Sequence, residues 1–254
     1  LDFPTDSESV DHAARRFRYV YDTYLRNAGT KTYLSVIPDK NTFIASQNGY
    51  PDKDYKALTE RLRSGFPEAK YIDISGLLSA DDFYYTDSHW RQERITKVAD
   101  EIAAQMGAER IGTCEIQDTG RPFYGVYYGQ AALPHAPERL FYLDNAVIRG
   151  LKVYNVETQS DIPVYDLGAA AGRDPYEMFL GGARSIIKIT NPNAAQERRL
   201  IVFRDSFGSS IAPLLAAGYS EITLVDIRYI SPLSLGKLID FTKADDALFL
   251  YSAS

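Results

Sequence analysis

Hydrophobic and polar positions along the first hundred residues change repeatedly between helical spacing and short apolar runs. Apolar side chains at Phe17, Val20 and Leu25 follow the helical period, while "KTYLSVIP" is a continuous apolar run typical of a buried strand. The pattern predicts, in order, helix 9–29, strand 31–38, helix 54–66, strand 70–75 and helix 92–107, the last ended by Gly107.

The last seventy residues show the same change of period. They predict strands at 185–192, 199–203, 221–227 and 247–252, and helices at 207–218 and 231–244. Strands that alternate with helices of this length indicate a parallel sheet covered on both faces. The two ends of the chain therefore predict an α/β protein with a mostly parallel sheet of about five strands.

The middle of the chain, from about residue 113 to 167, has a different pattern. Short alternating runs such as "PFYGVYYGQAALP" and "LKVYNVET" are broken by Gly, Pro and Asn. We interpret this part as a β-rich insertion in a single domain, because the length of 254 residues fits one large core.

Composition indicates which classes of ligand the chain could bind. A net charge of −6 without a basic block argues against nucleic acid. Among the 45% hydrophobic residues are 19 tyrosines, whose rings and hydroxyls suit carbohydrate, although most are expected at half-buried strand positions. The single cysteine, Cys114, allows no intrachain disulfide. No glycine-rich phosphate loop or metal-ligand spacing is present, so no cofactor and no metal are expected.

Ser206 is the candidate nucleophile. In open parallel sheets, ligands bind at the carboxyl ends of the strands, and strand 199–203 leads directly into "RDSFGSS". A serine at a tight strand-to-helix turn presents its hydroxyl beside unpaired helix N–H groups, which can stabilise an oxyanion. Ser206 could equally be a helix N-cap, a position that serine favours.

His89 is the candidate base. The chain has three histidines: His12 lies in the first helix, His135 in a proline-bounded loop, and His89 in "YYTDSHW" at the same predicted edge as Ser206. Asp87 could accept the Nδ1 proton and leave Nε2 facing Ser206. The alternative is that "TDSHW" only caps the following helix.

These two motifs give the chain a resemblance to a known family. With "YYTDSHW" and "RDSFGSS" it resembles the DHHW proteins, SGNH-hydrolase-like relatives of the alginate O-acetylation proteins, and "VIPDK", "FYGVYYGQAALP", "DPYEMFLGG" and "ITNPNA" extend the resemblance over nearly the whole chain. Ser88 stands where the second position of the family motif is His. The Asp–His pair precedes the serine, as in circularly permuted relatives, and Arg204 replaces the usual glycine. The resemblance implies a three-layer α/β/α fold.

The resemblance also implies an activity and its residues. Ser206 would be the nucleophile, His89 the general base and Asp87 its partner in acetyl transfer to a secreted polysaccharide, with acetyl groups supplied by a membrane-bound O-acyltransferase. It implies an extracytoplasmic location and an N-terminal anchor. As further substrate or oxyanion contacts we expect the backbone near Gly129, together with the side chains of Tyr128, Arg204, Lys40 and Trp90. The alternative is a non-catalytic glycan-binding or scaffolding subunit, because Arg204 could crowd the nucleophile; a serine esterase of small molecules is a third.

Overall fold

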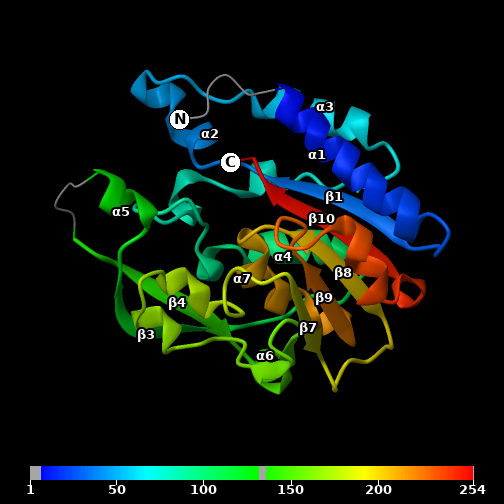
Figure 1. Cartoon of the computed structure of the whole chain (residues 1–254). Coiled ribbons are helices and arrows are strands. Elements are labelled where there is room, and N and C mark those ends of the chain that lie inside the picture. The colour runs from blue at the N-terminus through cyan, green and yellow to red at the C-terminus, as the bar shows by residue number, and fades with distance from the viewer. Residues whose placement is uncertain (1–6, 132–135, 254) are drawn as a thin grey trace.

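The computed structural model describes residues 7–131 and 136–253 and has a central sheet between two helical layers (Figure 1). The sheet has the strand order β2-β1-β10-β8-β9-β7-β5-β6. Its strands are β1 (Lys31–Ile37), β2 (Lys70–Tyr71), β5 (Lys152–Asn155), β6 (Ser160–Ile162), β7 (Ile186–Thr190), β8 (Arg199–Arg204), β9 (Glu221–Val225) and β10 (Asp246–Ser252). The predicted α/β class is confirmed.

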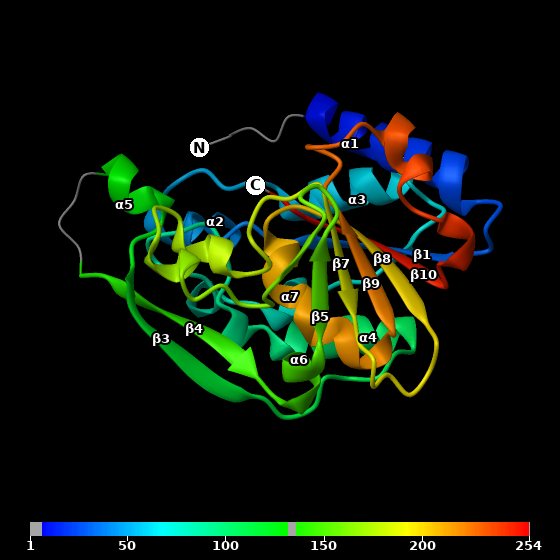
Figure 2. The ribbon, with the colours of Figure 1, turned by 60° about the horizontal axis from the view of Figure 1, so that its bottom comes forward.

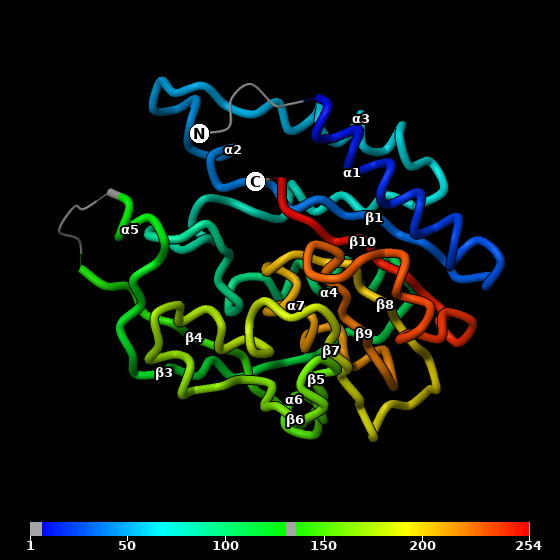
Figure 3. Tube along the Cα trace, viewed as in Figure 1, coloured from blue at the N-terminus to red at the C-terminus, as the bar shows by residue number. Residues whose placement is uncertain are grey.

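The sheet is larger than the sequence pattern predicted. Strands β2, β1, β10, β8 and β9 are parallel, and β10 runs beside β1 along its whole length (Figure 3). The predicted strand 185–192 is β7, which pairs antiparallel with β9. Strands β7, β5 and β6 extend the sheet to eight strands with antiparallel pairing. An apolar period predicts a strand but not its partner, so the periodicity could not show that the strands of the middle region join this sheet.

Two sets of helices cover the sheet because its strands are apolar on both faces. Helices α1 (Ser7–Val20) and α3 (Tyr55–Gly65) lie on one face, and α4 (Thr96–Met106) and α7 (Phe207–Leu215) lie on the other (Figure 1). Along β8, Ile201 and Phe203 face the first pair of helices, while Leu200 and Val202 face the second. The period-two alternation of a strand thus builds two cores.

The middle of the chain forms more than one kind of structure. Strands β3 (Glu115–Phe123) and β4 (Glu138–Asp144) pair in a separate antiparallel ribbon (Figure 2), and two short helices are present, α5 (Val126–Ala131) and α6 (Ala146–Gly150). The prediction of β structure for "GVYYGQ" is wrong, because this stretch is α5. The division of the chain into one domain with an insertion at about 113–167 stays a prediction.

One predicted helix is also wrong. Residues 231–244 form two 3₁₀ turns, Pro232–Lys237 and Phe241–Lys243, instead of an α-helix. The Asp240 side chain accepts the N–H of Thr242 and begins the second turn separately. Side chains that bond their own backbone compete with helix continuation. A further short helix, α2 (Asn41–Ile44), follows Lys40.

Candidate active site

Ser206 lies in the turn between β8 and α7, at the carboxyl edge of the parallel strands. Its side chain makes no capping hydrogen bond. Asp205 instead accepts the N–H of Phe207, the first residue of α7, with Oδ1 at 3.0 Å. Its Oδ2 accepts the N–H of Ser252 in β10 at 2.7 Å. The capping alternative for the Ser206 hydroxyl is therefore wrong, and this half-buried hydroxyl is available for another partner.

That partner is His89. Its Nε2 lies 2.7 Å from Oγ of Ser206, and its Nδ1 lies 2.6 Å from Oδ1 of Asp87. The His89 side chain is 14% exposed and that of Asp87 only 3%, so the base faces the solvent side and the acid is shielded behind it. Ser206, His89 and Asp87 form a hydrogen-bonded row in the order that acyl transfer by a serine requires.

The second carboxylate oxygen of Asp87 is also held. The backbone N–H of Val126 donates to Oδ2 at 2.9 Å. Burial raises the pKa of Asp87, but the hydrogen bonds from His89 and Val126 outweigh burial and leave that pKa below its ordinary value. Asp87 is thus a carboxylate at neutral pH and can orient the imidazole of His89.

The segment around His89 is a tight loop. An isolated antiparallel bridge joins Phe83 to Trp90, and the N–H of Tyr84 donates to the carbonyl of His89 at 3.0 Å. The next helical turn begins only at Gln92 and α4 only at Thr96. The alternative that "TDSHW" caps a helix is therefore wrong. We call residues 84–89 the catalytic loop.

Packing holds the imidazole ring in place. The ring of Tyr176 stacks on it at 4.0 Å between centroids, with an angle of 18° between the ring planes. Trp90 is fully buried, and its Nε1 donates to Oγ of Ser210 at 2.8 Å, as does the hydroxyl of Tyr176. The predicted role of Trp90 in contacting substrate is thus wrong, since the ring supports the site from inside.

Arg204 is likewise turned into the core. It has 0% of its surface exposed, and its guanidinium donates at 3.3–3.4 Å to the carbonyls of Asp205, Gly182 and Arg184. Burial lowers its pKa, an effect that the carboxylates of Asp226 and Asp205 oppose. A fully buried arginine contacts no substrate, so this predicted role is wrong.

Lys40 lies at the site, but its donors are already used. Its Nζ donates to the carbonyls of Tyr84, Tyr85 and Asp87, at 2.8, 3.1 and 2.9 Å. An ammonium group has three N–H donors, so no donor remains for a substrate or an oxyanion. The contact of Lys40 with substrate stays a prediction.

The region of Gly129 is more open than expected. Gly129 is exposed in α5, and outside its own helix no atom of the described residues lies within 4 Å of where a Cβ would lie. Tyr128 packs against Tyr124 with ring centroids 4.6 Å apart. The glycine in close contact with the catalytic loop is Gly125, whose Cβ would lie 2.2 Å from the carbonyl oxygen of Thr86. The oxyanion role of the Gly129 backbone and the substrate role of Tyr128 stay predictions.

The backbone of Ser206 remains available as an oxyanion donor. Within the described ranges, its N–H has no hydrogen-bond acceptor. Of the other two histidines, His12 is exposed in α1, and His135 lies outside the described residues.

Sequence reasoning missed four residues that build the site. Gly125 and Glu138 contact the catalytic loop, while Tyr176 and Ser210 support His89 and Trp90. "DPYEMFLGG" contains Tyr176 and "FYGVYYG" contains Gly125, but neither motif indicates which segment it packs against.

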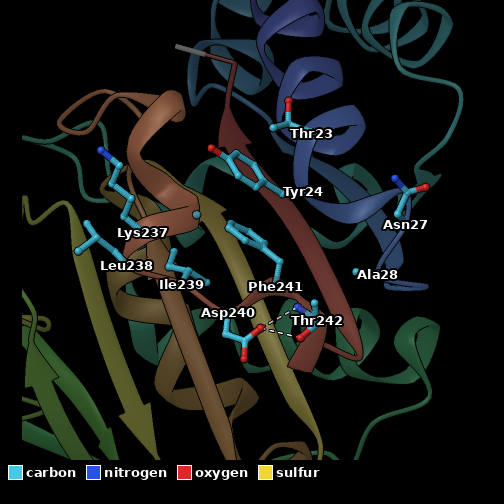
Figure 4. Close-up of a pocket in the computed structure, with 11 residues that line it drawn as sticks. Thr23, Tyr24, Asn27, Ala28, Lys237, Leu238, Ile239, Asp240, Phe241 and Thr242 are labelled. Carbon is cyan, nitrogen blue, oxygen red and sulfur yellow. Dashed lines mark hydrogen bonds between the residues drawn. The ribbon is translucent and has the colours of Figure 1, made fainter.

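Three further observations concern metal binding, membrane-spanning helices and a second cleft. In the described part of the chain, no group of three His, Cys, Asp or Glu side chains could hold a metal ion. Likewise, none of its helices has the length and apolar character to span a bilayer. An open cleft of about 600 Å³, whose lining includes Thr23, Asn27 and Asp240 (Figure 4), lies near the amino ends of β1 and β10, at the edge of the sheet opposite the triad.

Comparisons with known structures support this architecture. A DHHW family protein from Eubacterium siraeum has a TM-score of 0.72 at 17% identity, covering 94% of this chain and 84% of that one. PatB1 of Bacillus cereus has a TM-score of 0.75 at 18% identity, covering 98% and 90%. The O-acetyltransferase domain of Pseudomonas putida AlgJ has 0.54 at 13%, covering 97% and 83%. These likenesses show the fold.

Comparison of sequences matches a smaller part of the chain than comparison of structures. No curated protein matches the chain. The family described as "DHHW protein" matches residues 77–225, a span that includes Asp87, His89 and Ser206 and more than half of the 254 residues. The predicted resemblance is confirmed, and the chain belongs to the DHHW family.

Proposed function

We propose that this chain transfers acetyl groups to hydroxyls of a secreted polysaccharide through an acetyl-serine intermediate. The observation that carries the proposal is the hydrogen-bonded row of Ser206, His89 and Asp87 at the carboxyl edge of the sheet. The likeness of the fold to the O-acetyltransferase domain of AlgJ supports acetyl as the group that is transferred.

The first half-reaction acetylates Ser206. As Oγ attacks the carbonyl carbon of the donor ester, Nε2 of His89 removes the hydroxyl proton, and Asp87 stabilises the imidazolium that forms. The N–H of Ser206, which has no acceptor among the described residues, is available to the oxyanion. The tetrahedral intermediate then expels the donor oxygen, which takes the proton from His89, and acetyl-Ser206 remains.

The second half-reaction regenerates the serine. His89 removes a proton from an acceptor hydroxyl, whose oxygen attacks the acetyl carbon, and Oγ of Ser206 leaves with that proton. A sugar hydroxyl gives the acetylated glycan and water gives acetate, so transferase and esterase share the intermediate. In the proposed setting the enzyme works outside the cytoplasm, anchored at the membrane beside an O-acyltransferase that supplies acetyl groups.

A sugar acceptor is favoured by the tyrosines beside the triad. Tyr85 is 71% exposed and Tyr124 is 42% exposed. Each directly precedes a residue of the contact between Thr86 and Gly125, next to Asp87. A tyrosine ring offers both a stacking face and a hydroxyl to a sugar.

A non-catalytic glycan-binding subunit is the second candidate, and the exposed tyrosines suit it as well. Its other motivation, crowding of the nucleophile by Arg204, has no support because that side chain is buried away from Ser206. Oligosaccharide binding that is retained in Ser206→Ala, without ester turnover by the wild type, would favour this candidate.

Turnover of an activated acetyl ester tests the nucleophile. Ser206→Ala should lose about 10⁴-fold or more in kcat, since members of a triad act as a unit. Ser209→Ala is the matched control and should keep wild-type kcat. Ser209 lies three residues further along, in α7, and its buried hydroxyl has no hydrogen-bond partner among the described residues. Full activity in Ser206→Ala would refute the triad.

Mass spectrometry then separates transfer from hydrolysis. The wild type incubated with the ester should carry an acetyl adduct on the peptide that contains Ser206. Addition of an oligosaccharide should discharge the adduct faster than water alone and yield acetylated sugar. Discharge at an unchanged rate, with only acetate formed, would identify an esterase instead.

A further inference from the structure

Two charged residues from distant segments hold the catalytic loop by its backbone. Lys40, after β1, donates to three of the loop's carbonyl oxygens, those of Tyr84, Tyr85 and Asp87, at 2.8–3.1 Å. Glu138, in β4, accepts the N–H groups of Tyr85 and Thr86 at 2.8 and 2.7 Å, and also the Thr86 hydroxyl at 2.7 Å. Lys40 thus binds carbonyl groups of the loop, and Glu138 binds its N–H groups.

The loop has no regular structure of its own to fix these peptide groups. Between the bridge partners Phe83 and Trp90, the chain forms turns and bends. Hydrogen bonds to charged groups are shorter and about twice as strong as those between neutral groups, and both Lys40 and Glu138 make such bonds. A further bond, from the N–H of Tyr127 to the carbonyl of Thr86 at 3.0 Å, completes the pairing of Thr86.

Lys40 and Glu138 each make their hydrogen bonds to the loop and not to each other. Within the part of the chain that the structure describes, no ion pair joins their side chains. Both are half-buried, and Nζ of Lys40 also lies 4.8 Å from the centre of the Tyr127 ring. Because the charges of Lys40 and Glu138 both bind the catalytic loop, they fix the position of the Asp87 peptide group.

We propose that Lys40 and Glu138 are positioning residues, which fix the catalytic loop so that Asp87 holds His89 at hydrogen-bond distance from Ser206. This inference rests on the proposed acyl-transfer function. It also explains why β3 and β4 lie beside the active site: β4 supplies Glu138, and the segment after β3 supplies the N–H of Val126 to Asp87. A misplacement of about 1 Å in such a group costs on the order of 10²-fold in rate.

The test uses Lys40→Met and Glu138→Gln. Methionine keeps the length of the stem without the charge, and glutamine keeps the size but turns an amide N–H₂ toward the loop's own donors. Lys70→Met and Glu101→Gln are the matched controls, because their side chains make single hydrogen bonds, to the carbonyl of Gln105 and from its side chain, away from the site.

Two rates are measured: kcat and KM on an activated acetyl ester, and covalent labelling of Ser206 by a small sulfonyl fluoride. Both rates should fall about 10–10²-fold in Lys40→Met and in Glu138→Gln, with KM within about 2-fold of wild type. The controls should match the wild type. All rates are expressed per folded molecule, using urea unfolding curves, so a loss of stability alone leaves them unchanged.

Three results would overturn the inference. The first is unchanged kcat and labelling rate in the folded fraction of both variants. The second is a rise in KM at constant kcat in Lys40→Met, which would make Lys40 a substrate contact. The third is an equal fall in the controls. Failure of the proposed function gives a different result: the wild type would be labelled at Ser206 but would turn over no acetyl ester. The labelling rates of the variants would then still test whether Lys40 and Glu138 position the catalytic loop.

Discussion

Gly125 shows how the absence of a side chain shapes the active site. A Cβ at this position would lie 2.2 Å from the carbonyl oxygen of Thr86 and 2.4 Å from Cβ of Asp87. The close approach lets the next residue, Val126, donate its N–H to the Asp87 carboxylate. The depressed pKa of Asp87, and hence its charge, depends partly on that bond.

At the residue scale we therefore expect Gly125→Ala to impair catalysis. The added methyl group meets backbone atoms that cannot rotate away, so the catalytic loop must shift, and kcat on an activated acetyl ester should fall about 10²-fold. Overpacking should also lower the free energy of unfolding by about 1–3 kcal/mol. Gly76→Ala, with no atom within 4 Å of the new methyl, should change neither quantity appreciably. Equal behaviour of the two variants would contradict this account.

Helix α7 combines the nucleophile and its support in one element. Its first turn follows Ser206, and one turn later Ser210 accepts hydrogen bonds from the Trp90 indole and the Tyr176 hydroxyl, both at 2.8 Å. Tyr176 in turn stacks on His89. The neighbouring hydroxyl, on Ser209, is also buried but is without a hydrogen-bond partner in the described ranges.

At the element scale, these two serines predict opposite outcomes of the same substitution. Ser210→Ala leaves the buried Trp90 N–H without its acceptor and should lower the free energy of unfolding by about 1–3 kcal/mol. Ser209→Ala removes an unsatisfied buried hydroxyl and should leave stability unchanged or slightly higher. Urea denaturation of both variants measures the difference. A Ser209→Ala variant as unstable as Ser210→Ala would show that cavity formation, not hydrogen bonding, governs this helix.

At the scale of the whole molecule, a buried ion pair lies at the edge of the sheet opposite the triad. The triad lies at the carboxyl ends of the strands. At the amino ends, Arg198 pairs with Asp246 at 2.6 Å and donates to the carbonyls of Met106 and Gly107, at the end of α4. The Asp246 side chain is fully buried, and burial raises its pKa although Arg198 opposes that effect.

At the scale of the whole molecule, Arg198→Met should weaken the fold without changing the chemistry. It leaves a buried carboxylate unpaired and should cost about 3–5 kcal/mol at neutral pH. Without Arg198 the pKa of Asp246 in the folded protein rises further above its unfolded value, so the loss grows with pH. The loss should shrink as the pH falls, because the raised pKa lets the folded variant protonate Asp246 and so remove the unpaired charge.

The neighbouring arginine provides the control for this prediction. Arg199 pairs with Glu197 at 2.9 Å at an exposed site, where ion pairs contribute about 0–1 kcal/mol. Unfolding curves of Arg198→Met and Arg199→Met between pH 4 and pH 7 measure the two costs, and kcat at 25 °C measures the chemistry. A fall in kcat per folded molecule in Arg198→Met would show that this ion pair also affects the chemistry at the opposite edge, contrary to the prediction.

Periodicity along the chain was sufficient for the helices and strands that flank the site. The run "RLIVF" is typical of a strand buried on both faces, and its direct continuation into "RDS" places Ser206 at the carboxyl edge. Asp87 and His89 could be paired from sequence because they are two residues apart. Their juxtaposition with Ser206, 117 residues beyond His89, required the parallel order of strands that alternation with helices implies.

Contacts between segments were decided only by the tertiary structure. Lys40 and Arg204 have the same charge and the same predicted edge, but Lys40 points to the catalytic loop and Arg204 into the core. Gly125 and Gly129 lie in one motif, and only Gly125 contacts Thr86. The direction of a side chain depends on which surface packs against it, and such packing joins residues far apart in the chain. Local periodicity therefore does not predict these contacts, although it does predict the strands and helices that bring the contacting residues together.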